Sequence, residues 1–389
     1  MKVSKRITRI EPSLTRKMFN LAQNYDDVID LTLGDPDMAP PEELRRAACR
    51  AMEENRLHYS ANAGLPRARQ AVSRKIAEVW GQDCAPENIA ITVGGMEALF
   101  LSLHCLIDEG DEVIVFAPYY INYLQMIELC GGRPVVVNAY DAHKGLYVCR
   151  EELEAAVTDR TVAVIINSPN NPTGDVFSRE MLYDIAVAAQ AHDLAIISDE
   201  VYRTLLYDGR AHESVLQFPE AAGRTLVVDS MSKEYSMTGW RIGFAFGPGE
   251  IIANMVKMQE NVAACANVAS QYALVEAYEG KAQNSFIVDE FRRRRDYLYG
   301  ALSEIKWLRA REPKATFYMF VDISQTGYRS EEFAYKLLED VHVAVVPGVV
   351  YGKAYDSYIR VAYTRKIETL EKAVQRFHTF FDNLERGRQ

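Results

Sequence analysis

A lysine in the middle of the chain stands among groups that suit a phosphate. The segment Asp229-Ser230-Met231-Ser232-Lys233 follows an apolar run, and Arg241 comes eight residues after the lysine. Hydroxyls and a guanidinium are common phosphate ligands. An amine that attacks an aldehyde must be neutral, and nearby cations favour that form. A lysine on a loop is usually a solvated charge, but these neighbours predict that Lys233 binds a cofactor.

An acidic residue follows another apolar run. Asp199 lies in Ser198-Asp199-Glu200-Val201-Tyr202, directly after Leu194–Ile197. It is therefore expected at the carboxyl end of a strand, where open α/β sheets bind ligands. A carboxylate there can pair with a protonated pyridine nitrogen. The alternative for such a residue is a helix cap, and Glu200 is predicted to be a bystander.

Two further segments suit anions. Gly94 and Gly95, in Val93-Gly94-Gly95-Met96-Glu97, join a predicted strand to a predicted helix, where backbone N–H groups can approach an anion. They do not supply the G-x-G-x-x-G of a dinucleotide site. Arg360 lies between apolar residues in Ile359-Arg360-Val361-Ala362 and, if buried, needs an anionic partner. A substrate carboxylate and a structural salt bridge are both open for it.

The pattern S-x-S-K-x-x-x-x-x-G-x-R-x-G, here Ser230 to Gly243, resembles the cofactor-lysine signature of the class I/II aminotransferases, which are fold-type I pyridoxal-phosphate enzymes. Other motifs follow in the family's order over nearly the whole chain. The resemblance implies an aminotransferase that moves an amino group between an amino acid and a 2-oxo acid. It also implies that Lys233 holds pyridoxal 5'-phosphate as a Schiff base and serves as general base and acid.

The resemblance also assigns the cofactor's remaining contacts. Gly94, Gly95 and Met96 form the phosphate turn, where Met96 replaces a residue that is often a hydroxyl in the family. Ser230, Ser232 and Arg241 complete the phosphate site. Asp199 pairs with the ring nitrogen, Tyr202 and Asn171 bind the phenolic oxygen, and Tyr120 stacks on the ring. Tyr119 and Tyr123 are expected to be packing residues.

At the substrate end, the resemblance makes Arg360 the ligand of the α-carboxylate, with help from Asn171 and the backbone of Gly34 in Leu33-Gly34-Asp35-Pro36-Asp37. Pro347–Gly352 and Ala315–Tyr318 are expected to be scaffold and pocket wall. Tyr59 matches the tyrosine that reaches the phosphate of the neighbouring subunit. A homodimer with shared active sites is therefore expected.

Short apolar runs alternate with helical patterns along the middle of the chain, which indicates a mainly parallel sheet flanked by helices. The predicted strands are Ile89–Val93, Glu112–Phe116, Arg133–Val137, Val162–Asn167, Ala195–Ser198, Leu226–Asp229 and Ile242–Phe246. We expect an α/β fold with a large cofactor-binding domain over residues 41–285. Residues 1–40 and 286–389 are expected to form a smaller α+β domain.

The later part of the chain contains two more predicted strands and two helices. A long polar helix is expected over Asn284–Ile305, strands over Thr316–Asp322 and His342–Pro347, and a closing helix from Ile367. The run Arg292-Arg293-Arg294-Arg295 on the long helix is expected to be a solvated face without a functional role.

The bulk composition excludes several classes of protein. The 389 residues are 48% hydrophobic and 25% charged, as in globular enzymes, and the net charge of −10 disfavours nucleic acid and anionic membranes as partners. The six cysteines form no C-x-x-C pair, and the histidines form no H-E-x-x-H motif, so no metal site is expected. Neither a secretory signal nor a membrane span is predicted, and the cytoplasm is the expected location.

Two other functions use the same motifs. Carbon–sulfur lyases and other carbanion-forming pyridoxal-phosphate enzymes share the core site, although Gly239–Gly243 resembles the aminotransferases more closely. A third possibility is a regulatory protein that binds the cofactor without catalysis and also binds DNA. The acidic net charge disfavours it. The sequence does not identify the amino donor, because the side chains that contact its distal end come from loops.

Overall fold

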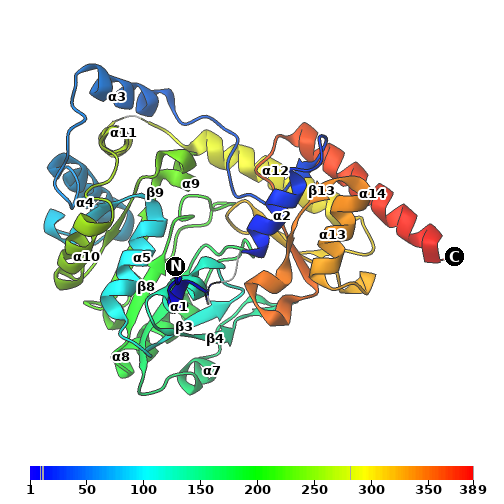
Figure 1. Ribbon diagram of the computed structural model, residues 1–389, viewed down its shortest axis with the longest axis horizontal. Coiled ribbons are helices and arrows are strands. Elements are labelled where there is room, and N and C mark those ends of the chain that lie inside the picture. Colours follow the sequence, from blue (N-terminus) through cyan, green and yellow to red (C-terminus); the bar gives the residue numbers. More distant parts are fainter. Residues whose placement is uncertain (9, 11–12, 281, 389) are drawn as a thin grey trace.

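A seven-stranded sheet forms the centre of the protein, described here from a computed structural model that covers residues 1–8, 10, 13–280 and 282–388 (Figure 1). The strand order is β2-β10-β9-β8-β7-β3-β4. Only β10 runs antiparallel to its neighbours. The strand bounds are β2 Ile89–Thr92, β3 Glu112–Ala117, β4 Arg133–Asn138, β7 Thr161–Asn167, β8 Ala195–Asp199, β9 Thr225–Ser230 and β10 Gly243–Phe246.

The central strands are apolar on consecutive residues because helices cover both faces of the sheet. Every residue of β2, β3, β9 and β10 is buried. Figure 1 shows helices packed around the sheet. The helices of this part are α3 Glu42–Glu53, α4 Pro66–Trp80, α5 Gly94–Leu106, α6 Asn122–Leu129, α7 Arg150–Ala155, α8 Arg179–Ala191, α9 Met231–Glu234, α10 Gly249–Val262 and α11 Val268–Glu279, with a small hairpin of β5 Tyr140–Asp141 and β6 Gly145–Leu146.

The C-terminal part builds a second core on an antiparallel sheet of order β11-β12-β15-β14. Its elements are α12 Ser285–Ser303, β11 Arg309–Ala310, β12 Tyr318–Asp322, α13 Ser330–Val341, β13 Val343–Ala344, β14 Val346–Pro347, β15 Tyr358–Ala362 and α14 Ile367–Arg388. The N-terminal arm joins it, since β1 (Ile29–Asp30) pairs parallel with β13, while α1 spans Lys5–Thr8 and α2 spans Leu14–Ala22. The predicted α/β fold is confirmed, and the boundaries at residues 41 and 285 stay predictions.

One predicted strand is divided in the structure, and one strand of the structure was not predicted. The single strand expected over His342–Pro347 is divided into β13 and β14, because β13 pairs with β1 whereas β14 pairs with β15. Residues 358–362, which carry Arg360, were not predicted as a strand and form β15 at the centre of the second sheet. An arginine in a five-residue run hides the strand pattern, because it interrupts the apolar sequence.

The prediction that the four consecutive arginines of α12 form a solvated face is wrong for two of them. Arg294 and Arg295 are each only 3% exposed. Arg294 binds Asp37 and the carbonyl of Thr364, and Arg295 binds both carboxylate oxygens of Asp208. A helix has 3.6 residues per turn, so four consecutive side chains point in all directions and cannot share one face.

The burial of Arg295 predicts a stability difference within this run. We expect Arg295→Met to lower the free energy of unfolding by about 2 kcal/mol, because it leaves the Pro313 carbonyl without its buried partner. This loss of free energy is smaller than the loss from breaking a fully buried ion pair, because the Asp208 carboxylate is half exposed. Arg292→Met removes an exposed arginine and should change stability by less than about 0.5 kcal/mol. Equal urea midpoints for the two variants would contradict the role given to Arg295.

Candidate active site

A cavity of about 450 Å³ lies where the central sheet, the N-terminal arm and the second sheet meet. Asp199 at the end of β8 and the turn after β9 both contribute to its wall, as expected for a ligand site at the carboxyl edge of a sheet. Most of the residues predicted for the site line this cavity: Gly34, Gly95, Met96, Tyr120, Asn171, Asp199, Tyr202, Ser230, Ser232, Lys233, Arg241 and Arg360.

Lys233 is the central amine of the cavity. Its Nζ donates a hydrogen bond of 2.7 Å to the carbonyl of Gly34, from the N-terminal arm. Burial, helped by Arg241 and Arg360 and opposed by Asp35 and Asp199, lowers the pKa of this amine to about 8. A substantial fraction of the amine is therefore neutral near physiological pH and available as a nucleophile.

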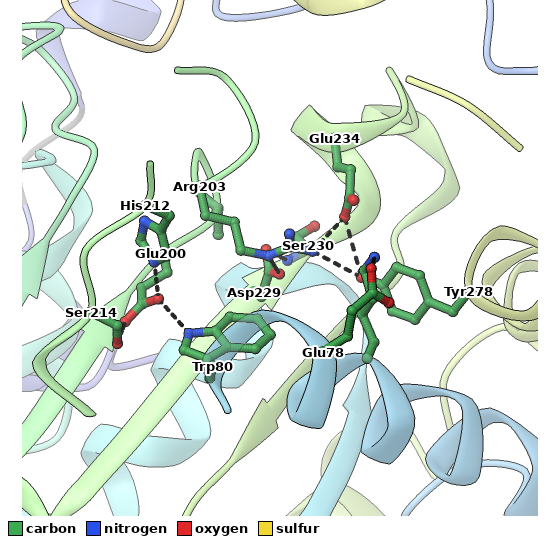
Figure 2. A network of polar contacts seen from close by, with 12 residues as sticks. Glu78, Trp80, Glu200, Arg203, His212, Ser214, Asp229, Ser230, Glu234 and Tyr278 are labelled. Carbon is green, nitrogen blue, oxygen red and sulfur yellow. Dashed lines mark hydrogen bonds and ion pairs between the residues drawn. The ribbon is translucent and has the colours of Figure 1, made fainter. Parts of the chain in front are cut away.

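The turn that carries Lys233 is held by local and buried contacts. Ser230 caps the short helix α9 by accepting a hydrogen bond from the amide of Ser232. Behind it, Arg203 donates to Asp229 at 2.6 Å and to Glu234 at 2.7 Å, with all three side chains at most 5% exposed (Figure 2). The residues on both sides of the lysine turn are thus fixed by one guanidinium, which orients Lys233 from outside the cavity.

Asp199 is the only acidic side chain that lines the cavity within the described part of the chain. Burial raises its pKa to about 6, and the hydroxyl of Tyr123, which donates to Oδ2 at 2.5 Å, opposes that rise. Tyr123 was predicted to be a packing residue, and it does pack in the core; the structure adds its hydrogen bond to Asp199. The signal available in the sequence was its position three residues after Tyr120; in the structure the amide of Tyr123 donates to the carbonyl of Tyr120 in the turn that leads into α6.

Glu200, the predicted bystander, points away from the cavity into a second polar network (Figure 2). Trp80 and Ser214 donate to its carboxylate at 2.7 Å each, and His212 also contacts it. Burial alone would raise the pKa of Glu200, but His212 and these donors lower it overall. Glu200 therefore anchors the back of the strand end that presents Asp199.

The start of α5 and the turn after β9 form an anion cradle. Gly94 has a φ of +78°, a conformation that residues with a side chain rarely adopt, and a Cβ on it would lie 2.6 Å from a guanidinium nitrogen of Arg241. Arg241 is held by the carbonyls of Thr238 and Val93. Ser230 and Ser232 share a hydrogen bond of 2.9 Å beside it. Helix amides, two hydroxyls and a guanidinium fit a phosphate.

Arg360 is 5% exposed and has no acidic partner in the part of the chain that the structure describes. Its Nη1 donates to Asn171 Oδ1 at 3.0 Å, and the other terminal nitrogen contacts the carbonyl of Thr32. Its Nε has no hydrogen-bond partner among the described residues. The salt-bridge alternative therefore lacks support, and a buried guanidinium with a free nitrogen fits an incoming carboxylate.

Several tyrosines line the cavity around these groups. Tyr202 donates to the hydroxyl of Tyr318 at 3.3 Å, and the guanidinium of Arg360 lies 4.2 Å from the centre of the Tyr318 ring. Tyr318 was predicted only as part of the pocket wall. A Cβ on Gly34 would lie 1.7 Å from its hydroxyl, so Tyr318 also requires glycine at position 34. Burial raises the pKa of Tyr120 and Tyr202, which keeps both as neutral donors.

Tyr59 does not line this cavity. Its side chain is 90% exposed beside a separate hollow formed with Leu57, His58 and Cys265. The structure therefore does not bring Tyr59 together with the other predicted site residues of the same chain. Within the described residues, no cluster of histidine, cysteine or carboxylate side chains could hold a metal ion, and no helix is long and apolar enough to cross a bilayer.

Comparisons with known proteins agree with this geometry. Residues 26–377 match the family model "Aminotransferase class I and II". The chain is 37% identical to an aspartate aminotransferase of Pyrococcus abyssi and 36% identical to aromatic-amino-acid aminotransferase 2 of Thermococcus litoralis, with 97% of each chain covered. The structure of aspartate aminotransferase from Thermus thermophilus with maleate superimposes with a TM-score of 0.92 at 36% identity, covering 98% of this chain and all of that one.

Relatives named for different amino acids are thus about equally similar to this chain, so the likeness does not select the donor. It does select the cofactor and the type of reaction, because the family model and the named relatives are all aminotransferases. The chain belongs to the class I and II aminotransferases, enzymes that use pyridoxal phosphate to transfer an amino group.

Proposed function

We propose that Lys233, Asp199 and Arg360 carry the amino-group transfer between an amino acid and a 2-oxo acid. Pyridoxal phosphate supplies an aldehyde that an amine can capture and a ring that withdraws electrons from an attached substrate. The observation that carries the proposal is the buried amine of Lys233, whose pKa is lowered to about 8, in one cavity with a buried carboxylate and a guanidinium that has no acidic partner.

The phosphate is held at the start of α5. Gly94 brings the guanidinium of Arg241 against the backbone, and the N–H groups of Gly95 and Met96 belong to the first turn of this helix. Ser230 and Ser232 supply hydroxyls. The thioether of Met96 donates no hydrogen bond to a phosphate, so the backbone N–H groups, the two serines and Arg241 must bind it.

We expect the aromatic ring of the cofactor to lie between a carboxylate at its nitrogen and neutral hydrogen-bond donors at its phenolic oxygen. Asp199 offers a carboxylate to the protonated ring nitrogen, and the hydroxyl of Tyr123 keeps that carboxylate oriented and ionised. Tyr202, Asn171 and Tyr120 line the same cavity; the first two would donate to the phenolic oxygen, and Tyr120 would stack on the ring. These neutral donors and the single carboxylate favour a positive charge at the nitrogen end of the ring.

Arg360 binds the α-carboxylate of the substrate through its terminal nitrogens, and Asn171 fixes the guanidinium at 3.0 Å. This contact orients the substrate so that its α-proton faces Lys233. The neutral Nζ of Lys233 accepts that proton and returns it at a neighbouring carbon, while the carbonyl of Gly34 steadies the amine.

Tyr59 supports a homodimer. Its ring is almost fully exposed, it lies outside the cavity of its own chain, and the hollow beside it holds the exposed Leu57. An exposed tyrosine beside an apolar hollow is typical of an interface. We therefore assign Tyr59 to the phosphate site of a partner subunit. A cytoplasmic location fits the six cysteines, which form no disulfide with one another in the described chain.

The role of Lys233 predicts a complete loss of function on its removal. Lys233→Ala should abolish the visible absorbance of the lysine-bound cofactor and lower amino transfer by more than about a thousandfold, because nucleophile and base are lost together. Lys257→Ala, on the exposed side of α10, should retain both. The checks are an absorbance spectrum and an assay of amino-acid product. Release of pyruvate and ammonia from cysteine without any oxo-acid acceptor would instead indicate a lyase.

The contact between Tyr123 and Asp199 predicts a change in pH dependence. Tyr123→Phe removes a hydrogen bond that favours the ionised carboxylate, so the pKa of Asp199 should rise. The acidic limb of kcat/KM should then move to higher pH by about one unit, the size of one charge-assisted hydrogen bond. The alkaline limb should stay in place. An unchanged acidic limb would leave Tyr123 as a packing residue.

The assignment of Tyr59 predicts complementation between inactive subunits. Tyr59→Ala and Lys233→Ala should each be impaired alone. A mixed dimer keeps one intact site, because the subunit with the lysine receives Tyr59 from its partner. Refolding the two variants together at equal amounts should restore about a quarter of wild-type activity, since half the dimers are mixed and each has one intact site of two. No recovery would mean that Tyr59 acts within its own chain or not at all.

A further inference from the structure

The first turn of α2 contributes a cation to the main cavity. Arg16 lines it together with Ser13 and Thr15. Its guanidinium lies 5.4 Å from the ring centre of Phe19, one turn along the helix, which holds the side chain against α2. In the part of the chain that the structure describes, Arg16 has no ion pair. It is a cation at a ligand cavity, and none of the described carboxylates forms an ion pair with it.

The charges around the cavity do not balance once the proposed function is assigned. Among the described residues, its cationic side chains are Arg16, Lys233, Arg241 and Arg360, and its one lining carboxylate is Asp199. Arg241 serves the phosphate and Arg360 the α-carboxylate. Lys233 is uncharged when it reacts, and Asp199 serves the ring nitrogen. Arg16 is therefore the one cation left without an assigned anion.

The remaining lining side chains offer no competing charge. From α5 and the start of α6 come Met96, Leu99, Ile121 and Asn122, which are apolar or neutral. A neutral donor substrate would leave Arg16, which is exposed at the cavity wall, paired only with solvent. A substrate with a second carboxylate would give it a bidentate partner, with Asn122 or the hydroxyls of α2 within the same cavity.

We propose that Arg16 binds the distal carboxylate of a dicarboxylic substrate and so sets the preference of this enzyme for acidic amino acids. The inference rests on the proposed function, because it uses Arg360 as the ligand of the α-carboxylate. The substrate then bridges two arginines from distant parts of the chain, with its α-carbon held beside Lys233. Arg16 contacts the substrate away from the reacting bond, so it contributes to binding and orientation.

Binding of unreactive acids to the enzyme loaded with cofactor tests the contact directly. Succinate and butyrate have the same carbon chain and differ by one carboxylate. We expect wild-type enzyme to bind succinate about ten- to a hundredfold more tightly than butyrate, as one charge-assisted contact provides. Arg16→Met should reduce this ratio to about one and leave the butyrate Kd unchanged, whereas Arg16→Lys should keep part of it.

Lys17→Met is the matched control, because it removes the next cation of the same helix. Lys17 lies 5.4 Å from the ring centre of Tyr335 and does not line the cavity. The control should keep the wild-type ratio of succinate to butyrate. Equal ratios in Arg16→Met and Lys17→Met, or no preference for succinate in the wild type, would overturn the inference.

The rates of the first half-reaction with aspartate and with asparagine separate this inference from the proposed function. Arg16→Met should lose most of the preference for aspartate through KM and keep the rate with asparagine. If neutral amino acids react as fast as aspartate in the wild type, the role of Arg16 is refuted and amino transfer stands. If no amino acid alters the cofactor spectrum, the proposed function fails, and the succinate titration still decides whether Arg16 binds a carboxylate.

Discussion

The arrangement of this active site depends on the burial of one amine, the side chain of Lys233. Burial of Lys233 lowers its pKa to about 8, so the amine is reactive near neutral pH. The same exclusion of water makes every anion in the cavity dependent on a protein donor. The N-terminal end of α5, together with Arg241 and two serines, provides the donors for a phosphate. Arg360 provides the donors for a carboxylate. The cations that bind these anions also help to keep the lysine neutral.

The reactive groups are held from behind by polar networks that never reach the cavity. Arg203 links Asp229 and Glu234 on both sides of the lysine turn, and Glu200 ties the strand end of Asp199 to Trp80 (Figure 2). These pairs are almost completely buried and have their partners close by, so breaking one leaves an unpaired charge. They add no chemistry of their own, but they fix the directions of the two central side chains.

Chemistry and substrate choice come from different parts of the chain. The central sheet supplies the amine, the carboxylate and the phosphate cradle, whereas the N-terminal arm supplies the Gly34 carbonyl and the cavity-lining face of α2. The second sheet adds Arg360 and Tyr318 through β15 and β12. Because α2 lines the cavity apart from the Gly34 carbonyl that binds Lys233, a change on α2 can alter which substrate is bound without removing the contact to the reactive amine.

The sequence by itself determined the groups whose role follows from their immediate neighbours. Lys233, Asp199 and the glycines at 94 and 95 lie at ends of apolar runs, and Arg360 lies inside one, so local pattern indicated them. Only the tertiary structure decided contacts between distant segments, such as Tyr123 with Asp199 and Arg16 with the cavity. It also buried Arg294 and Arg295, because the faces of a helix are assigned by what packs against them. Local sequence encodes the strand, turn or helix, whereas the partner that a side chain meets depends on the packing of the whole chain.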